Sequence, residues 1–166
     1  MTEKELSLLI TEEDNWTVAE AEETDIPFLI RFRPDMQPFI SSEKFNTRLS
    51  LTWKYEPDTD SGLPSDEDME VMDQIEDELL ESLEPELKAV LAFVFTGENQ
   101  RKWTWYAQNE TLAGSVMQKV MAEFPSVPLD LETEEDPQWI DYTEAVSGMG
   151  DSFSEYDEDD EDEEAK

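Results

Sequence analysis

Residues 88–108 have the sequence KAVLAFVFTGENQRKWTWYAQ, and this stretch decides the fold class. In its first part, Lys88 to Thr96, the positions on both faces of the expected strand are apolar, which is typical of a strand covered on both faces. Gly97 to Asn99 predicts a tight hairpin turn. In the second part, Trp103 and Trp105 alternate with polar residues, so Gln100 to Gln108 is the expected partner strand.

Four other segments show the period-two alternation of half-buried strands. They are Trp16 to Glu20, Ile26 to Arg33, Arg48 to Glu56 and Val127 to Leu131. Together with the central hairpin they predict six strands.

Two segments have helical spacing instead. Ser65 is followed three residues later by Asp68, which resembles a capping box at a helix start. Apolar residues then recur every three or four positions up to Leu83, and Pro85 predicts the exit. The second helix is expected from about Thr111 to Phe124, with an apolar stripe formed by Leu112, Val116, Val120 and Phe124.

The last six expected elements have the order βαββαβ. This order predicts an α+β protein, specifically a ferredoxin-like two-layer sandwich with an extra N-terminal β-hairpin. The hairpin would join either an edge of the sheet or a neighbouring strand, and a meander of the first three strands is the competing topology. The expected division is a single domain over residues 1–147 and an acidic, disordered tail over residues 148–166.

Charge excludes several classes of function. The 166 residues contain 45 Asp and Glu against 11 Lys and Arg, a net charge of -34. Such a surface should repel nucleic acid and anionic membranes, so we expect neither direct nucleic-acid binding nor membrane association, and a basic protein as partner. The chain has no Cys and no His, which removes disulfides, zinc fingers and catalytic triads built on those residues. No cofactor or metal is expected, and the acidic N-terminus does not resemble a signal peptide, so a cytoplasmic protein is expected.

Part of the negative charge is concentrated at the C-terminus. Residues 151–166 hold ten acidic residues and one lysine, a net charge of -9. The candidate partner-binding residues there form one uninterrupted run: Asp157, Glu158, Asp159, Asp160, Glu161, Asp162, Glu163 and Glu164. The tail predicts either a clamp on a basic partner or a solubilising extension.

Five basic residues fall on the polar parity of their strands and form the candidate binding face of the sheet. They are Arg31, Arg33, Arg48, Lys54 and Lys102. If the apolar parity faces the helices, these side chains gather on the open face and could hold an anion, an acidic peptide or the protein's own tail. The alternative is ordinary cross-strand pairing with carboxylates.

Two further patterns concern metal and nucleic-acid binding. Asp58 to Gly62 resembles a calcium loop over three positions, but its glycine comes one residue early and Met69 stands where a bidentate glutamate is needed, so no metal site is expected. The aromatic run Trp103 to Tyr106 beside Arg101 could stack nucleic-acid bases. Its tryptophans share the apolar parity, which favours core packing.

Several strings resemble a known family. They are Ile30 to Arg33, Leu49 to Tyr55, Gly62 to Pro64, Trp103 to Tyr106 and Asp136 to Tyr142. In this order and spacing they are similar to the bacterial domain-of-unknown-function family 695. That family has no agreed activity, so the resemblance implies no catalytic residues. It implies a looser similarity to small acidic regulators of ribonuclease E, which have a ferredoxin-like fold and an acidic tail.

The sequence thus predicts a non-enzymatic acidic regulator or inhibitor that binds a basic surface of a partner protein, with a nucleic-acid enzyme as one candidate. An immunity protein that neutralises a basic toxin is the first alternative. A small-molecule binder or enzyme using the basic sheet face is the second. No catalytic constellation stands out among the abundant carboxylates.

Overall fold

The computed structural model describes residues 5–6, 17–23, 26–33, 36–55, 64–97 and 99–146. Its strands are β1 (Thr17–Glu23), β2 (Ile26–Phe32), β3 (Thr47–Lys54), β4 (Ala89–Gly97), β5 (Gln100–Ala107) and β6 (Leu129–Glu135). The helices are α2 (Gln37–Ser41), α3 (Asp66–Leu83) and α4 (Glu110–Ala122), with a 3-10 turn η1 (Pro85–Leu87) and a helical segment at 140–146. The α+β class is therefore confirmed. The sequence did not predict α2 or segment 140–146.

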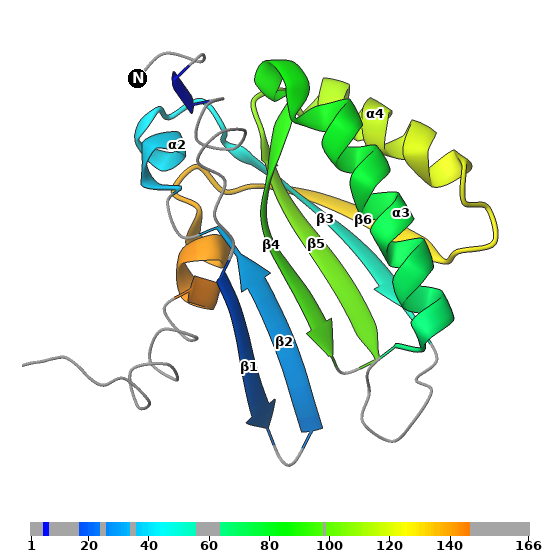
Figure 1. The fold of residues 1–166 in the computed structure, drawn as a ribbon. Helices are drawn as coiled ribbons and strands as arrows, with labels where there is room; N and C mark the ends of the chain where they lie inside the picture. The colour runs from blue at the N-terminus through cyan, green and yellow to red at the C-terminus, as the bar shows by residue number, and fades with distance from the viewer. Residues whose placement is uncertain are drawn as a thin grey trace, which may run out of the picture.

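All six strands form one antiparallel sheet with the order β1-β2-β4-β5-β3-β6 (Figure 1). Helix α3 connects β3 to β4, and α4 connects β5 to β6. The N-terminal hairpin joins the sheet through β2, which pairs with β4, and leaves β1 at the edge. A meander of the first three strands is wrong, because β4 and β5 lie between β2 and β3.

Side-chain caps begin both long helices, at Ser65 as predicted and at Asn109, which was not predicted as a cap. The Ser65 hydroxyl accepts a hydrogen bond from the backbone N–H of Asp68 at 3.2 Å. The Asn109 side chain accepts one from the N–H of Leu112 at 3.0 Å. Each contact satisfies a backbone donor that the first helical turn would otherwise leave unpaired.

The apolar stripe of α4 differs in part from the prediction. Val120 is buried, and Val116 and Phe124 are partly buried against the core, but Leu112 is 46% exposed and Ala113 and Met117 are buried in addition. Both stripes have helical spacing, so periodicity alone does not choose between them. Packing against the sheet does choose, since Ala113 and Met117 belong to the core under α3 and α4.

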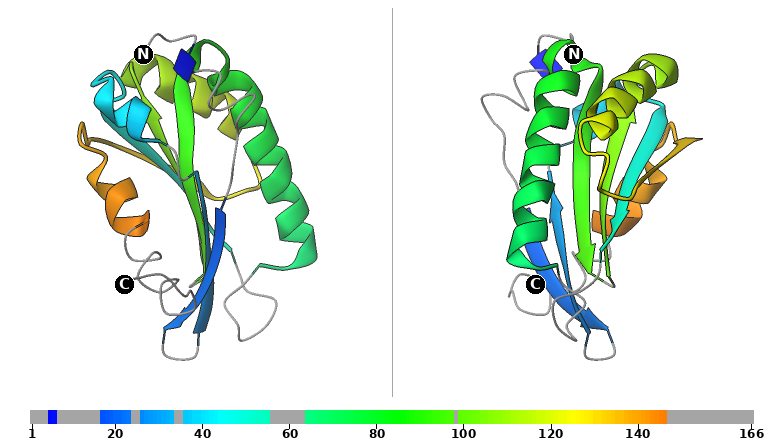
Figure 2. Two further views of the ribbon diagram at one scale, coloured as in Figure 1. Left: turned by 60° about the vertical axis from the view of Figure 1, so that its left-hand side comes forward. Right: turned by 90° about the vertical axis from the view of Figure 1, so that its right-hand side faces the viewer.

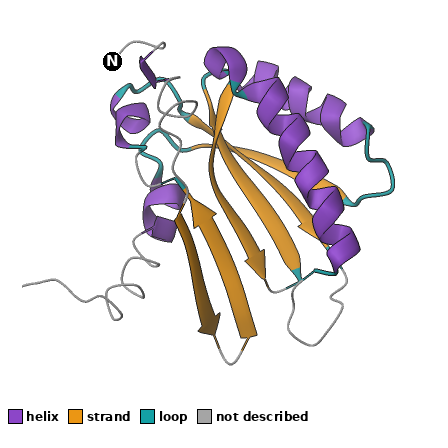
Figure 3. Ribbon diagram, in the orientation of Figure 1, coloured by secondary structure: helices purple, strands orange, loops and turns teal. Residues whose placement is uncertain are grey.

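The sheet is covered on both faces, but by different elements. Helices α3 and α4 cover one face over a core that includes Leu51, Trp103 and Trp105. Helix α2 and segment 140–146 lie on the opposite side (Figure 2), and the secondary-structure colouring in Figure 3 shows helices on both sides of the strands. A second core beneath them includes Phe39 and Trp139. A two-layer sandwich would leave this second face of the sheet open. Here α2 and segment 140–146 cover part of it.

A β-bulge between Leu91 and Phe93 changes which residues of β4 face each of these two cores. Before the bulge, Leu91 packs in the core under α3 and α4; after it, Val94 does so, while Phe93 packs in the second core. An inserted residue reverses the inward and outward alternation of a strand beyond it. This reversal passes to β2, which pairs with β4 beyond the bulge.

Candidate functional site

The structure does not bring the five predicted basic residues onto one face. Arg31 and Arg33 point to α3 and its C-terminal end, where each meets a glutamate. Arg48, Lys54 and Lys102 lie at the β3 and β5 positions that alternate with the core under α3 and α4, so they belong to the opposite face. The single basic face is therefore wrong. The β-bulge in β4 inverts the parity of β2 relative to β3 and β5, and a one-residue shift cannot be read from each strand separately.

Arg33 is held in a closed set of contacts. Its side chain is 4% exposed, and its two terminal nitrogens donate to the two carboxylate oxygens of Glu84 at 2.6 and 3.1 Å. Nη1 also donates to the carbonyl of Leu91 at 3.0 Å, and the backbone N–H of Leu91 donates to Glu84 at 3.1 Å. Bidentate pairs of this kind fix geometry strongly. Arg33 therefore joins β2 to β4 and the end of α3, and it presents no open face to a ligand.

Arg31 is bound to a buried carboxylate that the sequence did not single out. One oxygen of Glu76, which is 8% exposed, accepts hydrogen bonds from Arg31 Nη2 and, at 3.1 Å, from the Trp103 indole N–H. A signal for Glu76 was available. It lies four residues after Met72 and three before Leu79, on the buried stripe of α3. An acidic residue at such a position needs a cationic partner in the core.

Arg101 is the second residue that the sequence did not identify. It is 7% exposed, its Nε–H donates to the Thr96 hydroxyl at 2.9 Å, and Nη2 contacts the sulfur of Met69 at 3.6 Å. Its guanidinium carbon lies 5.9 Å from the Trp103 ring centroid. Burial lowers the pKa of Arg101, and the nearby Glu76 carboxylate opposes that change.

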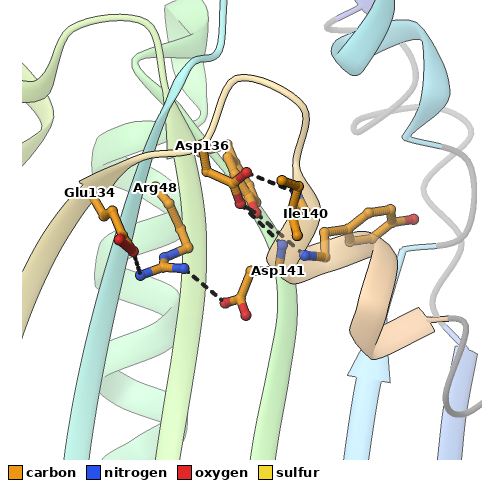
Figure 4. Close-up of polar contacts among 7 residues, drawn as sticks. Arg48, Glu134, Asp136, Ile140 and Asp141 are labelled. Carbon is orange, nitrogen blue, oxygen red and sulfur yellow. Dashed lines mark hydrogen bonds and ion pairs between the residues drawn. The ribbon is translucent and has the colours of Figure 1, made fainter.

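On the opposite face Arg48 lies between two carboxylates (Figure 4). Its Nη2 donates to Glu134 at 2.7 Å, and Nη1 lies 3.5 Å from Asp141. The Glu134 side chain is 63% exposed, so water screens this contact. Arg48 thus forms the cross-strand pairing that was the alternative to a binding role.

Asp136 organises the polar cluster drawn in Figure 4. Its carboxylate accepts hydrogen bonds from the Tyr106 hydroxyl at 2.8 Å, the N–H of Ile140 at 2.8 Å and the N–H of Asp141 at 3.1 Å. It therefore caps segment 140–146 and fastens it to β5. Burial and the Asp136 carboxylate raise the pKa of Tyr106, which keeps the phenol protonated as a donor.

The four tryptophans within the described residues belong to the core. Trp103, Trp105 and Trp139 are 0% exposed and Trp53 is 6% exposed. Trp139 stacks on Tyr106 with ring centroids 4.0 Å apart, and its indole N–H donates to the carbonyl of Phe45 at 2.8 Å. Side chains this buried cannot serve as a stacking platform for bases.

Some predictions concern residues outside the described ranges. These are the acidic tail at 157–164 and the rejected calcium loop at 58–62. Across the ranges that the structure does describe, acidic residues nowhere gather in a group of three or more suited to a metal ion. In those same ranges, every helix is too short or too polar to cross a membrane.

Three of the five strings that resemble the family contribute to these contacts, through Arg31, Arg33, Trp103, Tyr106 and Asp136. Comparison with family models gives a match to DUF695, a family of unknown function, over residues 14–146. The chain belongs to this family. No curated protein and no solved structure matches it. Membership of the DUF695 family therefore assigns no activity to the chain.

Proposed function

We propose that this DUF695 protein is a non-enzymatic acidic regulator that binds a basic surface of a partner protein. One observation carries the proposal: the outward side of α3 is a continuous acidic stripe. Its members are exposed and recur at helical spacing: Asp66, Glu70, Asp73, Asp77 and Glu81. No lysine or arginine occurs between Lys54 and Lys88 to neutralise them.

The shape and charge of this stripe favour a partner with a groove or patch of Lys and Arg. A row of carboxylates spaced along a rigid helix can engage several cations at once, much as phosphates do along a nucleic acid. Such complementarity accelerates association and makes it dependent on salt. A nucleic-acid enzyme whose binding patch is covered in this way fits the chemistry, as does a basic toxin neutralised by an immunity protein.

The finer fold assignment belongs to the same proposal. The strand order β4-β5-β3-β6, with helical crossovers through α3 and α4, supports a ferredoxin-like core to which the β1-β2 hairpin has been added. The similarity to acidic regulators of ribonuclease E rests on this arrangement and on the acidic composition. The tail at 157–164 is the second proposed contact with the partner.

The proposal is tested with two charge-matched variants. The stripe variant carries Glu70→Gln, Asp77→Asn and Glu81→Gln. The control variant carries Asp130→Asn, Glu132→Gln and Glu135→Gln on the exposed edge strand β6. Each variant removes three negative charges, so the two differ only in where the charges lie. Proteins captured from cytosol by the unmodified chain are purified, and their dissociation constants are measured at two salt concentrations.

We expect the stripe variant to weaken binding about tenfold or more, equivalent to about 1.4 kcal/mol, and the β6 variant to have a much smaller effect. Raising the salt concentration should weaken the complex further. Equal weakening by both variants would mean that the chain acts as an unspecific polyanion. Binding that persists unchanged at molar salt would exclude electrostatic capture altogether. One tight partner, instead of several weaker ones, would favour the immunity protein.

A further inference from the structure

A cavity of about 220 Å³ lies between α3 and the strands β1, β2, β4 and β5. The sheet register explains its floor. Val18, Arg31 and Val94 are paired across three strands in one row. Leu29, Thr96 and Arg101 are paired in the next row on the same side of the sheet. Arg101 and Thr96 thus share this cavity with an apolar wall.

Arg101 has hydrogen-bonding capacity to spare in this cavity. A guanidinium carries five N–H donors, of which one reaches Thr96 and one reaches the sulfur of Met69. Among the residues that the structure describes, no carboxylate forms an ion pair with Arg101, although the chain has 45 acidic residues. A cation that is only 7% exposed and lacks such a partner is costly to bury. An anion in the cavity would compensate it.

The surrounding charges restrict which anion is suitable. Glu76, Asp73 and Arg31 all act on Arg101 electrostatically, and Asp73 and Arg31 line the cavity. Because Arg31 is paired with Glu76, the two carboxylates would still repel a dianion such as phosphate more strongly than a singly charged carboxylate. The apolar wall formed by Val18, Leu29 and Val94 would hold a small hydrocarbon group. For scale, a protein cavity of about 150 Å³ can hold benzene.

We propose that this cavity binds a small organic monocarboxylate, with its carboxylate on Arg101 and its apolar body against Val18, Leu29 and Val94. The Thr96 hydroxyl, which accepts from Arg101, keeps its own proton to donate to the ligand. This site is distinct from the regulator role proposed above. The cavity lies between α3 and the sheet, whereas the partner is assigned to the exposed stripe, of which Asp73 alone also lines the cavity.

The test is a titration of the full chain with benzoate, followed by NMR of the Arg101 side-chain Nε–H. We expect a saturable shift with a dissociation constant on the order of 1 mM. Benzamide, which has the same shape without the charge, should bind at least about tenfold more weakly, because hydrogen bonds between charged groups are lost. Inorganic phosphate should also bind more weakly than benzoate.

Three variants separate this site from unspecific anion binding. Arg101→Met, followed by the backbone amide signal of Thr96 because the Arg101 reporter is gone, should raise the dissociation constant for benzoate at least about tenfold. Val18→Trp fills the opening of the cavity from an exposed strand position, leaves Arg101 in place and should also weaken benzoate binding. This variant provides the test if Arg101→Met does not fold. Arg48→Met on the opposite face should leave the dissociation constant for benzoate unchanged. Binding of benzamide or phosphate as tight as that of benzoate would overturn the proposal. So would the absence of a saturable shift up to about 20 mM benzoate, or benzoate binding that both site variants leave intact.

Discussion

The two faces of the sheet hold their arginines in different ways. On the face under α3, Arg33 and Arg101 are 4% and 7% exposed, and a buried Glu76 supports Arg31. On the opposite face Arg48 pairs with Glu134, whose side chain is 63% exposed. On this opposite face, the stack of Trp139 on Tyr106 and the capping carboxylate of Asp136 connect the elements. The same type of residue is therefore a core component on one face and a screened surface group on the other.

The largest effect is expected from the aromatic side of this comparison. Trp139→Ala removes a fully buried ring, its stack on Tyr106 and its hydrogen bond to the Phe45 carbonyl. We expect a loss of about 4 kcal/mol in the free energy of unfolding, measured by urea denaturation. Ile140→Ala, at the neighbouring position with 52% exposure, is the control and should change it by less than about 0.5 kcal/mol. Similar losses for both variants would show that segment 140–146 does not depend on this stack.

The ion-pair side should give the next largest effect. Glu76→Ala leaves Arg31 without its buried carboxylate and the Trp103 indole N–H without its acceptor. We expect a loss of about 2 kcal/mol in the free energy of unfolding, because the buried indole N–H loses its acceptor and Arg31, whose side chain is 34% exposed, loses its buried partner. The double variant Arg31→Met with Glu76→Leu should recover part of the loss, since replacing both members of the ion pair by apolar residues leaves neither charge without the other. No recovery in the double variant would place the effect in packing instead.

Alkaline pH tests the buried phenols on both faces. Burial raises the pKa of Tyr55 to about 12, and burial together with Asp136 raises that of Tyr106. The folded state then keeps protons that the unfolded chain releases above about pH 10. Stability should therefore be intact below about pH 10 and should fall with a slope of up to about 1.4 kcal/mol per pH unit for each tyrosine as pH rises further. Urea midpoints from pH 9 to pH 12 measure the slope, and Tyr55→Phe and Tyr106→Phe should each reduce it. A slope that neither variant changes would assign alkaline unfolding to other groups.

The smallest effect is expected at the screened pair. Glu134→Gln removes the charge that Arg48 contacts at 2.7 Å. Because Glu134 is mostly in water, we expect a change below about 1 kcal/mol that disappears at high salt. The same denaturation assay measures it. A loss comparable to that of Glu76→Ala would remove the distinction between the two faces.

The strands and long helices could be predicted because their signals are local. Alternation in Gln100–Ala107, the cap at Ser65 and the spacing along α3 depend only on neighbouring residues. Helix α2 escaped prediction because a helix of five residues has too few positions to show a period. Segment 140–146 escaped because its capping residue, Asp136, is identified only by the N–H groups that it meets.

The sequence by itself determined the α+β class, the order of the six strands and two long helices, the acidic character and the burial of Trp103 and Trp105. Only the tertiary structure decided which basic residues share a face. One inserted residue between Leu91 and Phe93 reverses the alternation beyond it, and β2 inherits that reversal through its pairing with β4. The sequence of one strand shows which of its side chains share a face. Whether side chains of two different strands share a face depends on how the strands are aligned with each other. Register is set by long-range pairing, and this pairing turns Arg31 toward Glu76 and places Arg101 in its cavity.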